Sequence, residues 1–358
     1  MPKMDLQEFF AGEQVLVTGA SGFIGWHVAN QLVQVGAKVR ALVRPTAIRP
    51  DGVFEWFTGD LLEPDSLKEA AKDCRYVFHV AGDYRFWARD FREIFANNVQ
   101  GTINVLEAAK AAGVERMVYT STTGLLQKGT PECLATEERL ASPASFRGPY
   151  KRSKYEALCE VQERAHAGWP IVITLPTAPI GPHDLRPTPT GMIIVKFLNG
   201  RIPMLARTGL NFADVRQCAL GHLLAMIRGR SGERYLLGGT NLWFAEFLRL
   251  LEPFAVHRVP RIYAPHWLSY TAACVSETIA TVSSDWKPFV TRESVRMSRG
   301  PHFSSNEKAE RELQYDVIPI EQAIRDAVED FAMRGIVPAL AVANGGANPV
   351  GCGLENRV

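Results

Sequence analysis

Apolar residues recur along the first half of the chain in two alternating patterns. Short apolar runs predict strands, and apolar positions three to four residues apart predict the helices between them. The strands are predicted at 14–18, 38–43, 53–57, 76–80, 116–120 and 171–175. The helical spacing is clearest at Phe23, Ile24, Val28, Leu32 and Val33, and it returns at Val99, Ile103, Leu106 and Ala109. This alternation indicates a doubly wound α/β fold, in which helices cover both faces of a parallel sheet.

The pattern loosens after Leu175. Five prolines within a short segment exclude a single regular element there: Pro176, Pro179, Pro182, Pro187 and Pro189. A helix is predicted at 217–228 and a strand at 234–237, followed by irregular, aromatic-rich structure to about Phe303. Two closing helices are predicted at 305–313 and 320–333. We expect this part to form a smaller lobe over the carboxyl edge of the sheet, where open α/β folds bind their substrates.

Composition narrows the class of protein. With 46% hydrophobic residues among 358, the chain can bury a large core. Its 40 basic and 38 acidic residues nearly cancel, so no basic field would attract nucleic acid. The six cysteines form no CxxC pair, which argues against a zinc site or a disulfide framework and for a reducing cytoplasm. No apolar run reaches the length of a signal peptide at the N-terminus or of a transmembrane helix elsewhere, so we expect a cytoplasmic protein.

The run from Val15 to Gly25 contains the motif Gly19-x-x-Gly22-x-x-Gly25 between a predicted strand and a predicted helix. The first glycine permits a tight turn, the second lets a phosphate approach the backbone, and the third lets helix and strand pack closely. The free amides of the helix N-terminus would then bind a pyrophosphate. The alternative is an ordinary strand-to-helix turn, but strand, helix and spacing coincide here. We predict a Rossmann-type dinucleotide site formed by Gly19, Ser21, Gly22, Phe23, Ile24 and Gly25.

The end of the second strand indicates which nicotinamide cofactor is bound. An acidic residue there would accept hydrogen bonds from the ribose 2′-hydroxyl, but the run 39–44 supplies only cations. Arg44 therefore favours the 2′-phosphate of NADP(H), with NAD(H) as the second option and a surface arginine without a ligand as the alternative. Asp60, followed by Leu61, is placed to meet the adenine amino group, or else to cap a helix.

Tyr150 and Lys154 lie four residues apart, which puts both side chains on one face of a helix. A free tyrosine titrates at about pH 10. The lysine ammonium and a positively charged nicotinamide would lower the pKa of Tyr150, making it the general acid in carbonyl reduction and the base in alcohol oxidation. A hydroxyl after the fifth strand would hold the substrate oxygen, and by position we choose Thr122, with Ser121 in reserve.

Other kinds of site find little support in the sequence. His79 lies within an apolar strand, where a packed, hydrogen-bonded histidine is expected, and His222 has no second metal-type residue at ligand spacing. The sequence has no Gly-x-Ser-x-Gly elbow of the kind that hydrolases use. We therefore expect no metal site and no hydrolase.

From Glu13 to Met333 the chain resembles the extended short-chain dehydrogenases/reductases of the NAD-dependent epimerase/dehydratase family. Within them it is most similar to the dihydroflavonol reductase-like group and to bacterial hopanoid-associated sugar epimerase proteins. Besides the glycine motif, the segments that carry the resemblance are 78–87, 98–102, 150–154, 187–191 and 303–305. The resemblance implies that Val80, Ala81 and Gly82 line the cofactor, that Pro176 to Pro179 wrap its nicotinamide end, and that Arg44 contacts the 2′-phosphate.

Two departures from the family pattern stand out. Thr122 occupies the usual position of a catalytic serine, a change that keeps the hydroxyl. Relatives commonly carry Val-His-Val-Asp-Asp where this chain reads Phe212-Ala213-Asp214-Val215-Arg216-Gln217. Because that segment borders the substrate lobe, the second departure indicates a specialised role, and the substrate of the family does not transfer directly.

The chain is accordingly divided into four parts. Residues 1–12 form an N-terminal extension, 13–176 the NAD(P)-binding Rossmann domain, and 177–334 a substrate-binding lobe interleaved with returning Rossmann elements. Residues 335–358 have little to pack and are predicted to be disordered.

Three functions fit these features. The first is an NADP(H)-dependent carbonyl reductase or alcohol dehydrogenase for a bulky apolar isoprenoid, sterol-like or aromatic substrate. This function is favoured by apolar residues of the lobe that could line a pocket for such a substrate, although residues of this kind are equally typical of a protein core. They are Trp243, Phe244, Phe247, Phe254, Tyr263, Trp267, Leu268 and Tyr270. The second is a nucleotide-sugar epimerase, for which a diphosphate clamp would be drawn from Arg201, Arg207, Arg216 and Arg261. The third is a non-enzymatic dinucleotide sensor.

Contacts with other molecules are predicted only in outline. The resemblance implies a homodimer through the helices at 98–112 and 150–165. Apolar segments at 267–275 and 279–282 suit a dimer interface or a pocket wall, with peripheral membrane contact as the alternative.

Overall fold

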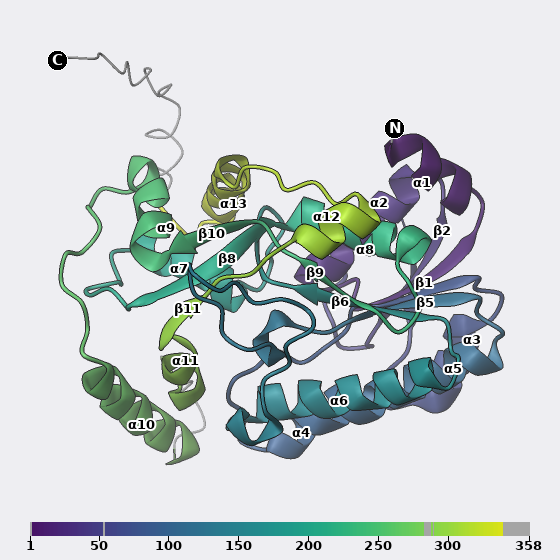
Figure 1. Cartoon of the computed structure of the whole chain (residues 1–358), viewed down its shortest axis with the longest axis horizontal. Helices are drawn as coiled ribbons and strands as arrows, with labels where there is room; N and C mark the ends of the chain where they lie inside the picture. The colour runs from purple at the N-terminus through teal and green to yellow at the C-terminus, as the bar shows by residue number, and fades with distance from the viewer. Residues whose placement is uncertain (1, 53, 283–287, 289, 339–358) are drawn as a thin grey trace.

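The computed structural model describes residues 2–52, 54–282, 288 and 290–338. At its centre is a seven-stranded sheet in the order β3-β2-β1-β4-β5-β6-β9 (Figure 1). Its strands are β1 (Gln14–Thr18), β2 (Lys38–Val43), β3 (Glu55–Thr58), β4 (Tyr76–His79), β5 (Arg116–Thr120), β6 (Ile171–Pro176) and β9 (Arg234–Leu237). Every neighbouring pair is parallel. The predicted doubly wound fold is confirmed.

Helices cover both faces of this sheet (Figure 1). One face carries α1 (Pro2–Phe10), α2 (Phe23–Gln34), α8 (Val215–Arg228) and α12 (Glu307–Leu313), and the other carries α3 (Pro64–Ala71), α4 (Phe91–Phe95), α5 (Gly101–Ala111) and α6 (Pro149–His166). Side chains of β1 alternate between the two cores: Val15 and Val17 pack with α2 and α8, and Leu16 packs with α3 and α5. Strands buried on both faces must be apolar throughout, which is why continuous apolar runs predicted them.

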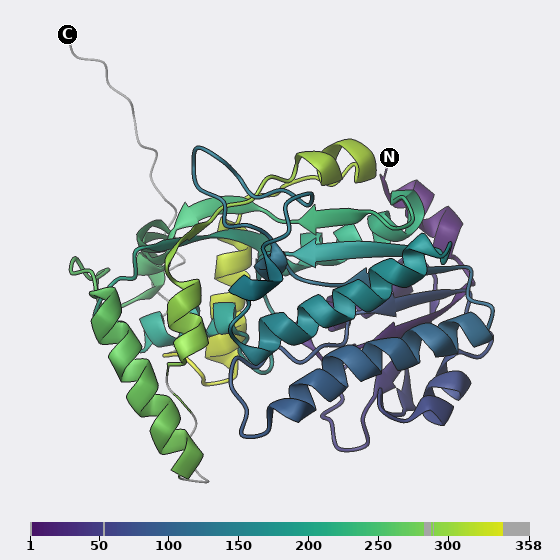
Figure 2. The same cartoon turned by 60° about the horizontal axis from the view of Figure 1, so that its bottom comes forward.

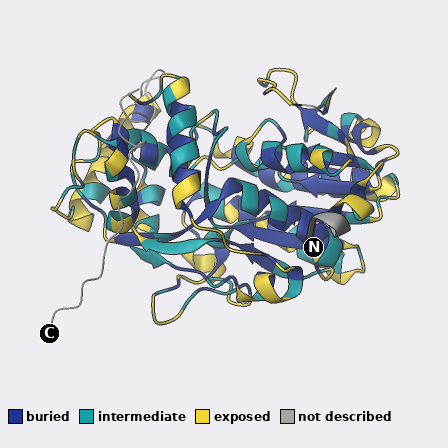
Figure 3. Ribbon diagram, turned by 90° about the horizontal axis from the view of Figure 1, so that it is seen from above, coloured by how far each residue is buried: buried dark blue, intermediate teal, exposed yellow. Residues whose placement is uncertain are grey.

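The smaller lobe is built around a second sheet. Its strands are β7 (Ala178–Ile180), β8 (Thr208–Asp214), β10 (Thr240–Trp243) and β11 (Gly300–His302), with β8 paired to the other three. Its helices are α7 (Pro189–Leu198), α9 (Phe244–Leu251), α10 (His266–Val282), α11 (Arg292–Met297) and α13 (Glu321–Met333). The described residues also form short 3-10 helices. These are η2 (Thr123–Leu125) and η3 (Pro143–Ser145) between β5 and α6, and η4 (Glu252–Phe254) after α9. Buried residues gather in the strands and on the inner faces of the helices (Figure 3).

The prediction of irregular structure up to about Phe303 is wrong. That stretch contains β10, α9, α10, α11 and β11. The helix α10 escapes recognition because its exposed side also carries apolar residues, such as Val275 and Val282, so the contrast between two faces is missing. The helix α9 has only eight residues, which is too short for a firm periodic signal.

The two ends of the chain differ in what the structure shows. Residues 2–10, which the sequence sets apart as an extension, form α1, and Leu6 and Phe10 are buried in the core beside α8. The predicted disordered tail begins at 335, but Val337 is buried in the core of the lobe, so the prediction is wrong for residues 335–338. The rest of that tail, from 339 onward, lies outside the described residues. None of the described helices is long and apolar enough to cross a lipid bilayer.

Candidate active site

The glycine motif forms a turn at the carboxyl end of β1, between the two halves of the sheet. Gly19 has a φ of +78°, which favours glycine, and the N–H of Gly22 closes the turn by donating to the Gly19 carbonyl (2.9 Å). Gly22 then begins α2, and no side chain caps that helix. The first-turn amides are therefore free to bind an anion, as a pyrophosphate cradle requires.

A second chain segment lies against the same turn. A Cβ on Gly19 would stand 2.6 Å from the backbone N of Ala81, and one on Gly25 would overlap the Gly19 carbonyl. Glycine at these positions thus lets α2 and the loop after β4 converge on the turn. The Thr18 hydroxyl accepts a hydrogen bond from the N–H of Ala81 (3.3 Å). Val80, Ala81 and Gly82 consequently lie beside the cradle, where the family resemblance puts them.

The arginines in and after β2 have different environments. The guanidinium of Arg40 donates to the carbonyls of Ala70 (2.9 Å) and Lys72 (2.8 Å) at the end of α3, so its role is structural. Arg44 is exposed at the carboxyl end of β2. Arg49 donates to the Thr58 hydroxyl (2.8 Å) at the end of β3. Of the two arginines in the run 39–44, Arg44 is therefore the one that is exposed to solvent near the cradle.

Asp60 forms a turn of its own rather than the cap of α3. Its carboxylate accepts a hydrogen bond from the N–H of Leu62 (2.9 Å), whereas the N-cap residue of α3 is Glu63. The cap alternative is thus wrong. The assignment of Asp60 and Leu61 to the adenine site stays a prediction.

Tyr150 and Thr122 come together from different elements. Thr122 caps the short helix η2 after β5, and its Oγ1 accepts a hydrogen bond from the N–H of Gly124 (3.1 Å). Tyr150 is in the first turn of α6. Burial raises the pKa of the Tyr150 phenol and the Glu293 carboxylate raises it further, whereas the hydrogen bond with Thr122 lowers it. The protein alone therefore does not produce the lower pKa that the sequence predicts from Lys154.

Lys154 is buried on α6, one helical turn after Tyr150. Its ammonium donates to the Thr120 carbonyl (2.8 Å) and lies 5.0 Å from the centre of the Tyr119 ring. A Cβ on Gly82 would be 3.5 Å from Nζ, so the loop after β4 passes directly over the amine. Burial lowers the pKa of Lys154 to about 8. The helix α6 thus joins the predicted catalytic pair to the loop of the predicted cofactor site.

Two buried hydroxyls near the carboxyl ends of β5 and β6 lack hydrogen-bond partners among the described residues. They are Ser121 Oγ, next to Thr122, and Thr177 Oγ1, next to Pro176. A buried hydroxyl without a partner costs free energy, which a bound polar group would recover. This observation, together with the uncapped α2, shows that the residues fit a dinucleotide. That its nicotinamide end is wrapped by the segment from Pro176 to Pro179 stays a prediction.

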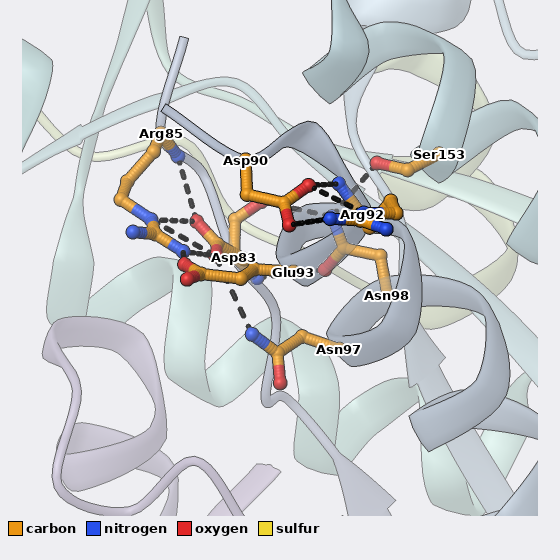
Figure 4. A network of polar contacts seen from close by, with 8 residues as sticks. All are labelled: Asp83, Arg85, Asp90, Arg92, Glu93, Asn97, Asn98 and Ser153. Carbon is orange, nitrogen blue, oxygen red and sulfur yellow. Dashed lines mark hydrogen bonds and ion pairs between the residues drawn. The ribbon is translucent and has the colours of Figure 1, made fainter. Parts of the chain in front are cut away.

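Asn98 connects three parts of the site, a role that the sequence did not reveal (Figure 4). It lies in a π-helical turn, η1 (Ala96–Gln100), and such turns are frequent at functional sites. Its amide donates to the Asp83 carbonyl (2.9 Å) and the Ser153 hydroxyl (2.9 Å), and its carbonyl accepts from the Asp83 N–H (2.7 Å). The loop after β4 is thereby fixed to α6. In that loop Phe86 contacts the Tyr150 ring edge-on, with centroids 5.6 Å apart.

The lobe contributes a buried acid that the sequence analysis missed. Glu293 in α11 is 6% exposed and lies against Gly148, the N-cap residue of α6. The Lys151 N–H faces its carboxylate, although neither oxygen makes a well-formed hydrogen bond with a described residue. Burial raises the pKa of Glu293 to about 7, while Lys151 and Arg296 oppose that rise. No local signal marks this residue, because its partners are about 145 positions away.

The histidines are packed as expected. His79 forms hydrogen bonds with the Thr18 hydroxyl (2.7 Å) and the Thr102 hydroxyl (3.0 Å), and burial lowers its pKa to about 3. His222 forms hydrogen bonds with the Thr120 hydroxyl (3.1 Å) and the Cys218 carbonyl (2.7 Å). Among the described residues, no cluster of His, Cys, Asp and Glu is arranged to hold a metal ion. The five described cysteines are free thiols.

The apolar residues proposed as a pocket wall do not form one surface. Phe247 and Phe254 are buried in the core of the lobe, and the Phe247 ring stacks on Phe212 at 4.1 Å. Trp267 and Tyr263 are exposed instead. These side chains therefore do not line a common pocket, and the aromatic content of the lobe is weaker support for an apolar substrate than expected.

The unusual Arg216 is held by two carboxylates. It pairs with Asp214 (2.6 Å), the N-cap residue of α8, and with Asp326 of α13 (2.6 Å). Arg207 lies over the Tyr263 ring, 4.9 Å from its centre. Two of the four arginines considered for a diphosphate clamp thus have other partners, and Arg216 links the sheet of the lobe to its last helix.

Comparisons with known proteins agree with this geometry. A "Putative dihydroflavonol 4-reductase" of Synechocystis sp. is 39% identical over 331 residues, which cover 90% of this chain and 95% of that protein. "Sterol demethylase protein B" of Methylococcus capsulatus is 30% identical over 326 residues, which cover 90% of this chain and 99% of that protein. The crystal structure of gox2253 is 38% identical, with a TM-score of 0.79 over 91% of this chain and 99% of that one.

More distant structures share the fold and include both nicotinamide cofactors. RMD from Pseudomonas aeruginosa, complexed with NADPH, has a TM-score of 0.66 at 22% identity, over 91% of this chain and 99% of that one. UDP-glucose 4-epimerase from Thermus thermophilus, in complex with NAD, has a TM-score of 0.69 at 22% identity, over 90% and 100%. Residues 15–238 match the family described as the NAD dependent epimerase/dehydratase family. The chain therefore belongs to that family, as an extended short-chain dehydrogenase/reductase similar to the dihydroflavonol reductase-like group, and it is an NAD(P)-binding protein of oxidoreductase type.

Proposed function

We propose that this protein is an NADP(H)-dependent carbonyl reductase or alcohol dehydrogenase in which Tyr150 is the general acid and base. The observation that carries the proposal is the meeting of Tyr150 with Thr122, one helical turn before the buried Lys154, whose amine lies beside the loop that contacts the glycine cradle. A hydroxyl pair and an amine at this position serve to move a proton to or from a substrate oxygen.

The residues divide the work as follows. The nicotinamide, when bound, supplies or accepts the hydride at the substrate carbon. Tyr150 gives its phenolic proton to the oxygen during reduction and takes it back during oxidation. Thr122 Oγ1 accepts from the Gly124 N–H, and its own proton, which faces the Tyr150 oxygen in this structure, would donate to the substrate oxygen when a substrate is bound. Lys154 stabilises the phenolate that remains on Tyr150 after reduction.

The finer parts of the proposal concern cofactor and substrate. The exposed Arg44 supports NADP(H) over NAD(H), because a guanidinium binds a phosphate with two hydrogen bonds. A bulky apolar substrate, such as a sterol-like, isoprenoid or aromatic ketone, is supported by Phe86 beside Tyr150 and by the names of the two relatives, which mention a sterol and a dihydroflavonol. We also infer a cytoplasmic homodimer through α5 and α6, which sedimentation velocity tests.

The decisive experiment follows NADPH absorbance against a panel of sterol, terpenoid and aromatic ketones. Tyr150→Phe removes only the phenolic oxygen and should lower kcat by about 10²-fold or more while leaving NADPH affinity unchanged. The matched control is Tyr155→Phe on the same helix, whose ring packs against Phe146. If Tyr150→Phe turns over as fast as Tyr155→Phe, the proposal is wrong.

The same assay tests the two other functions. An epimerase would convert a nucleotide sugar without net consumption of the cofactor. Arg216, one of the arginines that could bind the diphosphate of such a substrate, is instead paired with Asp214 and Asp326. A sensor would bind NADP(H) with no turnover of any substrate, and Tyr150→Phe would then preserve its biological role.

A further inference from the structure

The exposed side of α10 carries apolar residues from one end of the helix to the other, with His266, Thr271, Thr278 and Thr281 as its exposed polar residues. Leu268, Val275, Ile279 and Val282 are spaced at helical intervals and are 40%, 55%, 43% and 86% exposed, and Trp267 at the start of the helix is 70% exposed. Glu277 is the only Asp, Glu, Lys or Arg in α10, and it is buried in an ion pair with Arg292 of α11. The solvent-exposed side of α10 therefore carries no Asp, Glu, Lys or Arg, which is unusual for a surface helix.

Arginines flank this face on the segment that leads into α10. A surface hollow of about 820 Å³ is lined by Arg249, Arg258 and Arg261, with Glu252 as the single acid. The Glu252 carboxylate already accepts a hydrogen bond from the Val259 N–H (2.8 Å). Exposed apolar residues continue around the hollow, with Val256 78% and Ile262 68% exposed. The exposed apolar residues of α10, together with the arginines and exposed apolar residues of the segment that precedes it, are here called the α10 face.

The opposite side of α10 leads to the active site. Its buried residues Ala273 and Ala280 face inward, and α11 packs beside it, with Arg296 donating to the Tyr270 hydroxyl (2.8 Å). From α11, Glu293 reaches Gly148 and Tyr150. In Figures 1 and 2, α10 lies at the outer edge of the lobe, away from the large sheet.

We propose that the α10 face docks the enzyme on a bilayer that contains anionic lipids. Charge complementarity selects this occupant. Three arginines against one engaged acid attract phosphate headgroups, and the uncharged helix face enters the acyl boundary beneath them. Trp267 lies at the junction of the two regions, a position that tryptophan favours at membrane interfaces. A second copy docked face to face would bring like charges together at the hollow.

The test is flotation of the full chain with vesicles, without cofactor or substrate, so its result does not depend on the proposed reaction. Wild type should bind vesicles containing phosphatidylglycerol, and high salt should weaken the binding. Arg258→Gln/Arg261→Gln should lower the partition coefficient about fivefold per arginine. Trp267→Gln/Val275→Gln/Ile279→Gln should lower it at least about tenfold.

Matched controls are Met333→Gln, which removes an apolar residue that is 82% exposed elsewhere, and Arg92→Gln, which removes an exposed cation of α4. Both should bind as wild type does. Brominated phosphatidylglycerol should quench wild-type fluorescence, and Trp267→Phe should remove most of that quenching. Circular dichroism confirms that each variant is folded.

Three results would overturn the proposal. The first is wild type that fails to float with anionic vesicles at low salt. The second is triple-variant binding equal to that of Met333→Gln. The third is sedimentation velocity, in the absence of lipid, in which the triple variant alone changes a dimer into a monomer, because the α10 face would then be covered by a second copy.

Discussion

The Glu293 carboxylate occupies the space that any side chain at Gly148 would need. Gly148 has an ordinary extended backbone (φ −97°, ψ 158°), so glycine is required there by the neighbouring acid rather than by the backbone. Because Gly148 begins the helix that carries Tyr150, the contact joins the lobe to the catalytic helix.

Gly148→Ala should therefore destabilise the protein by about 1–3 kcal/mol through overpacking, and it should lower kcat by displacing Tyr150. Glu293→Ala creates room for the added methyl group. The double variant should recover most of the loss, and urea unfolding of the four proteins measures the coupling. Additive effects of the two changes would contradict the contact.

Glu293 should make stability depend on pH. Burial raises its folded-state pKa from 4.5 to about 7, so the native state keeps a proton that the unfolded chain loses. Stability should therefore fall by about 3 kcal/mol as pH rises through that window and then level off. Glu293→Gln should flatten this fall, as urea unfolding at about pH 5 and about pH 8 would reveal. An equal loss in both proteins would exclude Glu293 as its source.

Glu293→Gln should also shift the pH profile of the reaction. The ionised carboxylate raises the pKa of Tyr150, so its removal should lower that pKa. In alcohol oxidation, the limb of kcat that requires deprotonated Tyr150 should move to lower pH. A merely structural role would change kcat at every pH and leave the limb in place, and Glu293→Asp should restore the wild-type profile in part.

Asn98→Ala should loosen the loop that brings Phe86 to Tyr150. It leaves the backbone N–H and carbonyl of Asp83 without these partners, at about 1–3 kcal/mol for each buried group, and the Ser153 hydroxyl keeps only its bond to the Tyr150 carbonyl. We expect lower thermal stability and lower kcat. The neighbouring Asn97 makes one long contact with Asp83 (3.5 Å) and supplies the control Asn97→Ala. Indistinguishable variants would remove Asn98 from this role.

Arg44→Gln should change cofactor preference. Loss of a charge-assisted contact with the 2′-phosphate costs about 1.5–3 kcal/mol, so NADPH affinity should fall about 10- to 100-fold while NADH affinity stays the same. Arg40→Gln is the comparison, because Arg40 binds carbonyls at the end of α3 and its loss should lower stability instead. Calorimetry with both cofactors measures the ratio, and an unchanged ratio would reject the role of Arg44.

Much of the fold follows from local features of the sequence. A parallel strand buried on both faces needs an unbroken apolar run, and its neighbours in sequence need glycine and proline to turn, so β1 to β6 could be read in order. The helices α9, α10 and α11 were missed because their positions depend on contacts with distant parts of the lobe and not on a local pattern of apolar residues. Apolar residues of α10 lie on its exposed side as well as on its buried side, so no local period distinguishes the two.

The site divides along the same line. The motif from Gly19 to Gly25 and the pair Tyr150 and Lys154 lie within single turns or helices, where spacing in sequence sets spacing in space. The contacts of Glu293 with Gly148 and of Asn98 with Ser153 join residues about 145 and 55 positions apart. Such contacts arise only when separate elements pack, so the sequence by itself determined the glycine turn and the spacing of the proposed catalytic pair, and the tertiary structure alone decided which side chains surround them.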